Sequence, residues 1–432
     1  MPNSSFVARR MTKSDTRSAG TLLVLTFVTL AGAAEYRGKN LFHLPVSSLA
    51  AKPGAYRVAG ATIYVGMEAE PADNPRIQYY DAKTRRIGTI ENVSSHEYRT
   101  NGSPVVTFVL DSPVSPVVEK RFLVEHGPDR LGASLWQAPG ADRRSTIMLI
   151  HGADDETRAM GFLIPYFVSH GLNVITYDQR GTDDSTGNWR YSGPDSKAED
   201  AVAILQKVEN DAAVDAHRIG VWGFSNGGWS APIVPTRFPL AFLILKSAPS
   251  ESITENVLYE IGQALREHDR FTSEQTSPAL AFERTMLLAL QTNSNWRTAG
   301  EALNAAKKQS WFPYMRVPPG MTTPPPPPML AALQAALIYD PAATLLRVRT
   351  ATLALFGALD KNVDASDSAA RFRKAAKQAG LKDLTIVTFP GAGHTLLRST
   401  TGYEDDPLLP ERTVEGYPEI IIRWLDARGF TK

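Results

Sequence analysis

The feature that most constrains the fold is an alternation of short apolar runs with helical stretches, which begins near Lys120 and continues almost to the C-terminus. The runs are nearly continuous in apolar residues, which is typical of strands covered by helices on both faces. Strands that alternate with helices usually pair in parallel. We therefore predict a doubly wound, mostly parallel sheet. Its strand candidates are residues 146–150, 173–177, 219–223, 241–245, 351–356 and 384–389, with helices over residues 197–209 and 366–379 and a hairpin of residues 121–125 and 131–137.

A β-rich pattern precedes the alternation. Residues 35–119 carry β-branched and aromatic residues between frequent turn residues, for example over residues 56–65 and 105–110. Asn101-Gly102 is a strong signal for a hairpin turn. We predict a small β-rich accessory region here, and no motif in it points to chemistry.

A helical pattern interrupts the alternation at residues 251–345, between two predicted strands. This segment includes the proline run 324–328, for which we predict neither helix nor inner strand but polyproline geometry. An insertion at the carboxyl ends of parallel strands lies where open α/β sheets bind their ligands. We expect a helical cap over an active site, and a surface linker is the alternative interpretation of the proline run.

The N-terminus has the pattern of a targeting segment. A basic stretch from Arg9 to Arg17 precedes the apolar run of residues 21–30, and small residues follow at 31–34. Residues 1–34 are therefore predicted to be a signal peptide that is cleaved after Ala33 or Ala34, which implies an exported protein, periplasmic or secreted. An uncleaved membrane anchor is the alternative, although the run has only about half of the ~20 apolar residues of a spanning helix.

Composition excludes several function classes. The chain has no cysteine, which rules out disulfides, cysteine-ligated metals and thiol nucleophiles. Lys and Arg number 46 against 45 Asp and Glu, so no strong field would attract nucleic acid or an anionic membrane. We expect chemistry based on oxygen and nitrogen groups, without a metal or organic cofactor.

The candidate nucleophile is Ser225, in the G-x-S-x-G sequence of residues 223–227. The motif directly follows the predicted strand of residues 219–223 and precedes a predicted helix of residues 228–233. This strand–turn–helix context is the one that a nucleophile elbow requires, because glycines permit a strained turn that presents the hydroxyl above the sheet edge.

A serine hydroxyl needs a base, and the elbow predicts the chain order serine, acid, histidine. Only His268 and His394 follow Ser225. We favour His394, which lies in a glycine-rich loop after the last apolar strand, whereas His268 lies in a charged helical run. The acid should follow the preceding strand, where Asp360 is favoured over Asp364, which can instead cap the next helix.

An acyl-transfer site also needs two backbone donors for the developing oxyanion. The amide of Asn226, next to the nucleophile, is one candidate. The other is expected in the loop after residues 146–150, where we favour the Ala153 amide and expect His151 to be structural.

Five motifs together resemble the α/β-hydrolase superfamily, and the resemblance covers roughly residues 120–430. They are residues 149–152 (LIHG), 177–181 (YDQRG), 223–228 (GFSNGG), 357–363 (GALDKNV) and 391–394 (GAGH). The chain is similar to the bacterial esterase, dienelactone-hydrolase-like and prolyl-oligopeptidase-like branches. The resemblance implies the triad and the oxyanion donors already named. It also implies a structural role for Asp178 and Arg180.

Two departures from these families matter. The loop after Gly152 reads Ala-Asp-Asp-Glu instead of the glycine-rich HGGG of many lipases and esterases, and residues 35–119 are too few for an oligopeptidase propeller.

We predict carboxylic ester hydrolysis through an acyl-enzyme, on a small-molecule ester or short peptide. The alternatives are a serine peptidase or aminopeptidase with the same triad, a thioesterase, lactonase or lipase, and a non-catalytic binding protein with a hydrolase fold.

Overall fold

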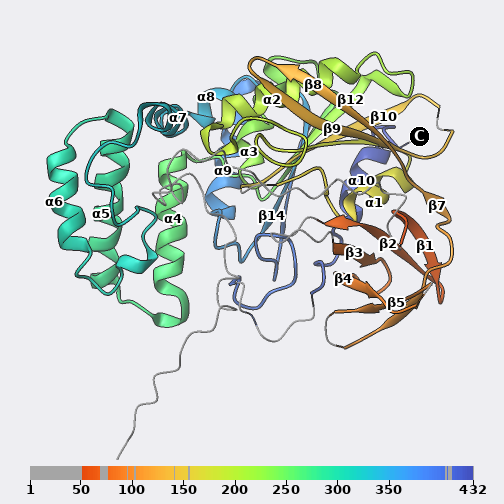
Figure 1. Cartoon of the computed structure of the whole chain (residues 1–432), viewed down its shortest axis with the longest axis horizontal. Coiled ribbons are helices and arrows are strands. Elements are labelled where there is room, and N and C mark those ends of the chain that lie inside the picture. The colour runs from red at the N-terminus through yellow and green to blue at the C-terminus, as the bar shows by residue number, and fades with distance from the viewer. Residues whose placement is uncertain are drawn as a thin grey trace, which may run out of the picture.

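The computed structural model describes most of the chain beyond residue 50, namely residues 51–68, 76–94, 96–101, 104–140, 142–153, 156–403, 406 and 411–431. The predicted signal peptide and Gly102 of the predicted hairpin turn lie outside these residues. Figure 1 shows a central sheet flanked by helices, a second sheet formed by N-terminal residues, and a group of helices to one side. None of the described helices is long and apolar enough to cross a membrane.

The N-terminal part is a seven-stranded sheet, in the order β6-β5-β4-β3-β2-β1-β7, in which all neighbours are antiparallel. Buried aromatic and aliphatic side chains form its core. The predicted segment of residues 56–65 is in fact two strands, because Ala59 and Gly60 both have positive φ and reverse the chain. The strands are β1 (Gly54–Val58), β2 (Ala61–Glu68), β3 (Arg76–Asp81), β4 (Arg86–Asn92), β5 (Glu97–Thr100), β6 (Thr107–Val109) and β7 (Ser115–Pro116).

The central sheet has eight strands, in the order β15-β14-β13-β12-β10-β11-β9-β8. The hairpin β8–β9 forms one edge and β9 pairs antiparallel with β11, while the other five pairings are parallel. The predicted strands overlap these strands, and the prediction of a mostly parallel sheet is confirmed. The strands are β8 (Val118–His126), β9 (Asp129–Gln137), β10 (Arg144–Ile150), β11 (Asn173–Tyr177), β12 (Val214–Phe224), β13 (Phe242–Lys246), β14 (Ala351–Gly357) and β15 (Leu384–Phe389).

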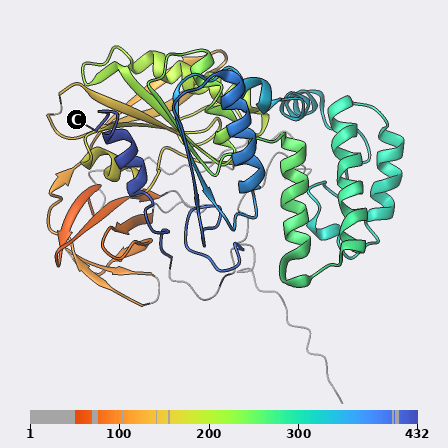
Figure 2. The same cartoon turned by 180° about the vertical axis from the view of Figure 1, so that it is seen from behind.

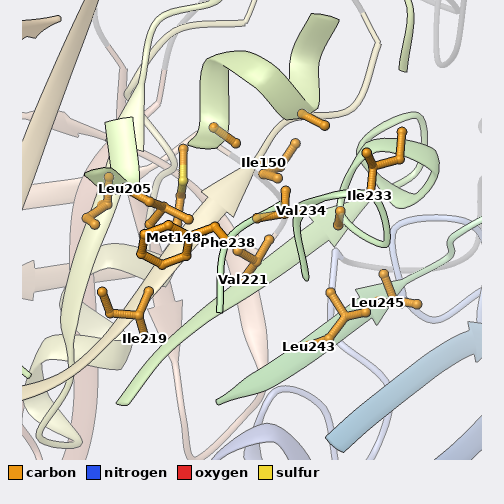
Figure 3. Packing of buried hydrophobic residues seen from close by; sticks show 14 of the residues in the cluster. Met148, Ile150, Leu205, Ile219, Val221, Ile233, Val234, Phe238, Leu243 and Leu245 are labelled. Atoms are coloured by element: carbon orange, nitrogen blue, oxygen red, sulfur yellow. The ribbon is translucent and has the colours of Figure 1, made fainter. Parts of the chain in front are cut away.

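Helices cover both faces of this sheet, which explains its continuous apolar strands. On β10, Met148 and Ile150 pack into the cluster on one face, and Ile147 and Leu149 pack into the cluster on the other. Figure 3 shows the first cluster, where β10, β12 and β13 meet Leu205 of α2. Burial of one such side chain contributes ~1.5–3 kcal/mol. The first face carries α2 (Pro194–Val208) and α9 (Ala365–Ala379), and the second carries α1 (Leu163–Ser169) and α10 (Glu419–Asp426).

A helical insertion connects β13 to β14 and stands beside the sheet in both views (Figures 1 and 2). Its apolar core is shared with Trp229, on the short helix that follows the predicted nucleophile. The prediction of polyproline geometry throughout residues 324–328 is wrong, because a helix begins at Pro327. Proline is compatible with the first helical turn, whose amides have no partner within the helix. The short helix is α3 (Gly227–Ser230), and the helices of the insertion are α4 (Ile253–Arg266), α5 (Ser273–Thr292), α6 (Trp296–Ala306), α7 (Pro327–Leu337) and α8 (Pro341–Leu345).

Candidate active site

The chain makes a sharp turn at Ser225, between β12 and α3. Ser225 is buried and has a φ of 52°, in the left-handed region that side chains rarely adopt. Flanking glycines make the turn possible: a Cβ on Gly223 would lie 2.6 Å from the Ala231 Cβ, and one on Gly227 would lie 2.4 Å from the His151 carbonyl oxygen. The predicted strand–turn–helix arrangement is therefore present, and its glycines are needed for close packing.

The structure brings Ser225, His394 and Asp360 into one hydrogen-bonded line. His394 Nε2 lies 2.9 Å from the Ser225 hydroxyl, and His394 Nδ1 lies 2.8 Å from Asp360 Oδ2. The three residues come from the elbow, the loop after β15 and the loop after β14, respectively. These strands are separated in the chain but end at the same edge of the parallel sheet.

Asp360 is held in place by its own loop. Its Oδ1 accepts hydrogen bonds from the amides of Asn362 and Val363, at 2.8 and 2.9 Å, which leaves Oδ2 directed at the histidine. Its backbone carbonyl accepts a hydrogen bond of 2.9 Å from the Tyr259 hydroxyl on α4, so the insertion contacts this loop directly. Because Asp360 is buried, these bonds define a single orientation of its carboxylate.

The competing candidates are placed elsewhere. Asp364 caps the N-terminus of α9, where its carboxylate accepts hydrogen bonds from the amides of Ser366 and Asp367. It is thus the helix cap that the sequence offered as its alternative role. His268 lies on a 3-10 turn after α4, and its side chain is outside what the structure describes.

His394 is fixed by groups around its backbone and ring. The Ser247 hydroxyl, directly after β13, donates a hydrogen bond of 2.6 Å to the His394 carbonyl. The Phe224 ring lies 5.1 Å from the imidazole, measured between centroids. The same loop reaches the N-terminal sheet, because Leu397 bridges to Thr413, whose amide donates to the Arg85 carbonyl beside β4. The N-terminal sheet therefore supports the loop that carries the histidine.

The two residues predicted as oxyanion donors lie in adjacent segments. Asn226 follows Ser225 as the N-cap residue of α3, and Ala153 follows Gly152 in the loop after β10. A Cβ on Gly152 would lie 3.6 Å from the Ser225 Cβ, so this loop runs beside the serine. His151 has the structural role that we expected, because its Nε2 pairs with the Tyr177 carbonyl oxygen at 2.5 Å. Burial lowers the pKa of His151 to about 4.

Asp178 and Arg180, for which the sequence predicted a structural role, belong to two separate ion-pair groups. The Arg158 guanidinium binds the Asp178 carboxylate and also pairs with Asp184. Arg180 pairs with Asp200 at 2.7 Å and with Asp129 at 2.5 Å. The carboxylates of Asp178, Asp183 and Asp184 lie close enough together to suggest a cation site, but Arg158 supplies positive charge in their midst. We therefore assign no metal to them.

A buried lysine that the sequence interpretation missed, Lys246, lies near the hydrogen-bonded line of Ser225, His394 and Asp360. Its Nζ lies 4.2 Å from the centroid of the Phe224 ring and 5.4 Å from that of Tyr417. Burial lowers the pKa of Lys246 to about 7, while the nearby Asp360 carboxylate acts in the opposite direction. The sequence signal was a lysine at the end of an otherwise apolar strand. The structure shows that every residue of this strand is buried.

A second group that was missed lies inside the insertion. Glu260 on α4 is 4% exposed, and neither of its carboxylate oxygens has a hydrogen-bond partner among the described residues. Arg316 is 3.7 Å from it, and the Arg316 amide donates to Glu283 on α5. Burial raises the pKa of Glu260 well above its ordinary value; the Arg316 charge acts in the opposite direction, and the charges of Asp360 and Glu251 add to the rise. Glu260 is thus within electrostatic reach of the Asp360 carboxylate.

Residues 78–391, well over half of the chain, match the sequence profile of the X-Pro dipeptidyl-peptidase (S15) family. The chain belongs to this family. As an S15 protein it is a serine hydrolase of the α/β-hydrolase superfamily, as the sequence motifs predicted.

Other comparisons are more distant. Two curated Escherichia coli relatives, each named "Uncharacterized 31.7 kDa protein in traX-finO intergenic region", are 36% identical over 62 residues, which is 14% of this S15 chain. The match spans only 22% of each relative's length. A Pyrococcus furiosus esterase structure has a TM-score of 0.43 at 13% identity, covering 72% of this chain and 90% of its own. The Porphyromonas gingivalis dipeptidyl peptidase 4 structure has a TM-score of 0.42 at 16% identity, covering 81% and 47%.

Proposed function

We propose that this serine hydrolase cleaves carboxylic esters through an acyl-enzyme, with Ser225 as nucleophile, His394 as general base and Asp360 as the residue that orients the base. The observation that carries the proposal is the hydrogen-bonded line from the Asp360 carboxylate through the imidazole to the serine hydroxyl. Burial of Ser225 and Asp360 at the sheet edge supports it, because water then competes little for these contacts.

The chemistry follows from the roles of the three groups. As the Ser225 oxygen attacks the ester carbonyl, its proton passes to His394 Nε2, and the Asp360 carboxylate stabilises the imidazolium through Nδ1–H. The imidazolium then returns the proton to the leaving alkoxide, and the acyl group remains on Ser225. Water, deprotonated by His394, releases the acid in the second half of the reaction.

The negative oxygen of the tetrahedral intermediate requires donors beside Ser225. We assign this role to the backbone amides of Asn226 and Ala153. The support is that the loop containing Gly152 runs against the serine, while Asn226 is its neighbour in the chain. Removing one such donor in other hydrolases lowers kcat by about 10²–10³-fold.

The decisive experiment is an activity profile across nitrophenyl esters of increasing acyl length and aminoacyl amides, run beside Ser225→Ala and with a fluorophosphonate probe. We expect ester turnover and probe labelling in the native chain, and neither in Ser225→Ala. A folded native chain that is neither labelled nor active would instead support the non-catalytic binding role.

Peptide cleavage by the same residues is the second candidate. It is supported by the family to which the chain belongs, X-Pro dipeptidyl-peptidase, and by Glu260, a buried carboxylate that has no hydrogen-bond partner among the described residues and only a loose contact of 3.7 Å with Arg316. Such a carboxylate could bind a substrate ammonium group. The discriminating measurement is the ratio of kcat/KM on aminoacyl amides to that on neutral acyl esters. A large ratio would favour the peptidase.

Three further expectations remain part of the proposal. The helices from α4 to α8 would act as a cap, for which the contact of Tyr259 with the Asp360 loop is the support. Residues 1–34 would direct export, which N-terminal sequencing of the mature protein from the native host tests. The partner would be a small ester or short peptide, with no nucleic acid and no organic cofactor or metal.

A further inference from the structure

A buried lysine on α2 connects the two segments that carry the proposed oxyanion donors. Lys197 is 6% exposed. Its Nζ donates a hydrogen bond of 2.8 Å to the Asn226 side-chain oxygen and another of 3.2 Å to the Gly152 carbonyl oxygen. The Gly152 carbonyl also accepts a bond of 3.4 Å from the Gln179 side chain. One cation thus contacts both the elbow and the loop after β10.

The contact with Gly152 matters because of peptide geometry. The Gly152 carbonyl and the Ala153 N–H belong to the same planar peptide unit and point in opposite directions across it. A cation that holds the carbonyl oxygen therefore fixes the direction of the Ala153 N–H. It also draws electron density toward that oxygen, which makes the N–H a stronger donor, as in any chain of coupled hydrogen bonds.

The contact with Asn226 acts on the second donor. The Asn226 side chain accepts a hydrogen bond from Lys197, which restrains the position of Asn226 at the start of α3. The same lysine therefore sets the separation between the two segments, one of which contains Ser225. The charge of Lys197 also acts on the neighbouring loop, because it contributes to lowering the pKa of the buried His151.

We propose that Lys197 is a positioning residue that holds and polarises the Ala153 amide through the Gly152 carbonyl and anchors Asn226 through its side chain, and so stabilises the oxyanion formed when Ser225 attacks. The inference rests on the proposed function. It assigns no substrate contact to Lys197. It gives the lysine a role that appears only when charge develops on the substrate oxygen, which separates it from a purely structural link between α2 and the elbow.

The test compares an ester with its thionoester, in which sulfur replaces the carbonyl oxygen. Sulfur accepts hydrogen bonds poorly, so amide donors favour the ester, and the ratio of the two turnover rates reports on the oxyanion site. For Lys197→Met we expect kcat on a nitrophenyl ester to fall about tenfold to a hundredfold, less than for complete loss of a donor. KM should change little, and the ester-to-thionoester ratio should fall with kcat.

The control is Lys207→Met, which removes an exposed lysine from the same helix and should leave kcat and the ratio unchanged. Lys197→Arg keeps a charged donor and should recover part of both. If Lys197→Met does not fold, Lys197→Gln replaces it, because glutamine retains a neutral donor. A smaller fall of the same ratio is then expected.

Two outcomes would overturn the inference while sparing the proposed function. They are a kcat that is unchanged in folded Lys197→Met, and a kcat that falls while the ester-to-thionoester ratio keeps its native value. Failure of the proposed function itself looks different, because the native chain would then show neither fluorophosphonate labelling nor ester turnover.

Discussion

The carboxyl ends of the strands, around Ser225, and the helical insertion both bury charged side chains, but the hydrogen bonds to these side chains differ in the two regions. At the sheet edge, the Asp360 carboxylate accepts hydrogen bonds from two backbone amides and pairs with His394. In the insertion, Glu260 is equally buried, yet its oxygens have no hydrogen-bond partner among the described residues. Its charged partner is Arg316, at 3.7 Å, and a buried carboxylate without hydrogen bonds opposes folding. The folded chain thus supplies hydrogen bonds to both carboxylate oxygens of Asp360, whereas it supplies none to those of Glu260 among the described residues.

The largest effect expected at the sheet edge comes from Ser225→Ala. Loss of the nucleophile should lower kcat by about 10⁴–10⁶-fold, because only binding and oxyanion stabilisation remain. Steady-state kinetics on a nitrophenyl ester measure it. Ser230→Ala, at the buried serine that ends α3, is the matched control and should keep native activity. Equal losses in both variants would mean that the effect is one of packing.

Asp360→Asn tests whether the fully bonded carboxylate is needed as a charge. The amide keeps the shape but cannot stabilise the imidazolium, so kcat should fall by about 10⁴-fold. Asp364→Asn, four residues along the chain, should retain activity and stability, since asparagine caps a helix about as well as aspartate. If Asp364→Asn were the more damaging change in the same kinetic measurement, the assignment of the acid would be wrong.

Glu260→Gln examines the insertion. If the Glu260 carboxylate binds a substrate ammonium group, its replacement should raise KM for an aminoacyl amide about tenfold to a hundredfold, which is the value of a charge-assisted hydrogen bond. KM for a neutral acyl ester should stay the same, and thermal stability should not decrease. Glu301→Gln, at an exposed glutamate of α6, is the control. A parallel rise of KM for both substrates would contradict recognition of charge.

The smallest effects concern stability against pH, and they should have opposite signs in the two regions. Burial lowers the pKa of Lys246 from 10.5 to about 7, so between these values the unfolded chain binds more protons than the folded one. The contribution of Lys246 to the free energy of unfolding therefore rises with pH across this window, by at most about 1.4 kcal/mol per unit. Lys246→Met should remove that rise in denaturant titrations at pH 7, 8 and 9.

In the insertion, burial raises the pKa of Glu283 from 4.5 to about 7. The folded chain then binds more protons than the unfolded one in this window, so the contribution of Glu283 to stability falls as pH rises from 4.5 to 7. Glu283→Gln should flatten this fall, measured in the same way between pH 5 and 7. If the contributions of Lys246 and Glu283 to the free energy of unfolding changed with pH in the same direction, the predicted contrast between the two regions would be wrong.

Much of the sheet and of the candidate triad could be predicted locally. Strands β10 to β15 each contain an apolar run, although β12 begins five residues before its run, and Ser225, Asp360 and His394 each follow a strand within a distinctive glycine-containing loop. The hairpin β1–β2 was missed because its turn residues lie inside an otherwise strand-like segment. The start of α7 was missed because the proline run obscured the fact that its last residues can begin a helix.

The sequence by itself determined a mostly parallel sheet and the strand–turn–helix context of Ser225, and it singled out Ser225, Asp360 and His394 as candidates, because each depends on short-range patterns of apolar residues, glycines and loop positions. Only the tertiary structure decided that Lys197 joins the two loops beside Ser225, that Lys246 lies against the aromatic rings next to His394, and that Glu260 is buried without a hydrogen-bond partner among the described residues. The physical reason is that burial and pairing of charge depend on contacts between segments far apart in the chain, which no local pattern encodes.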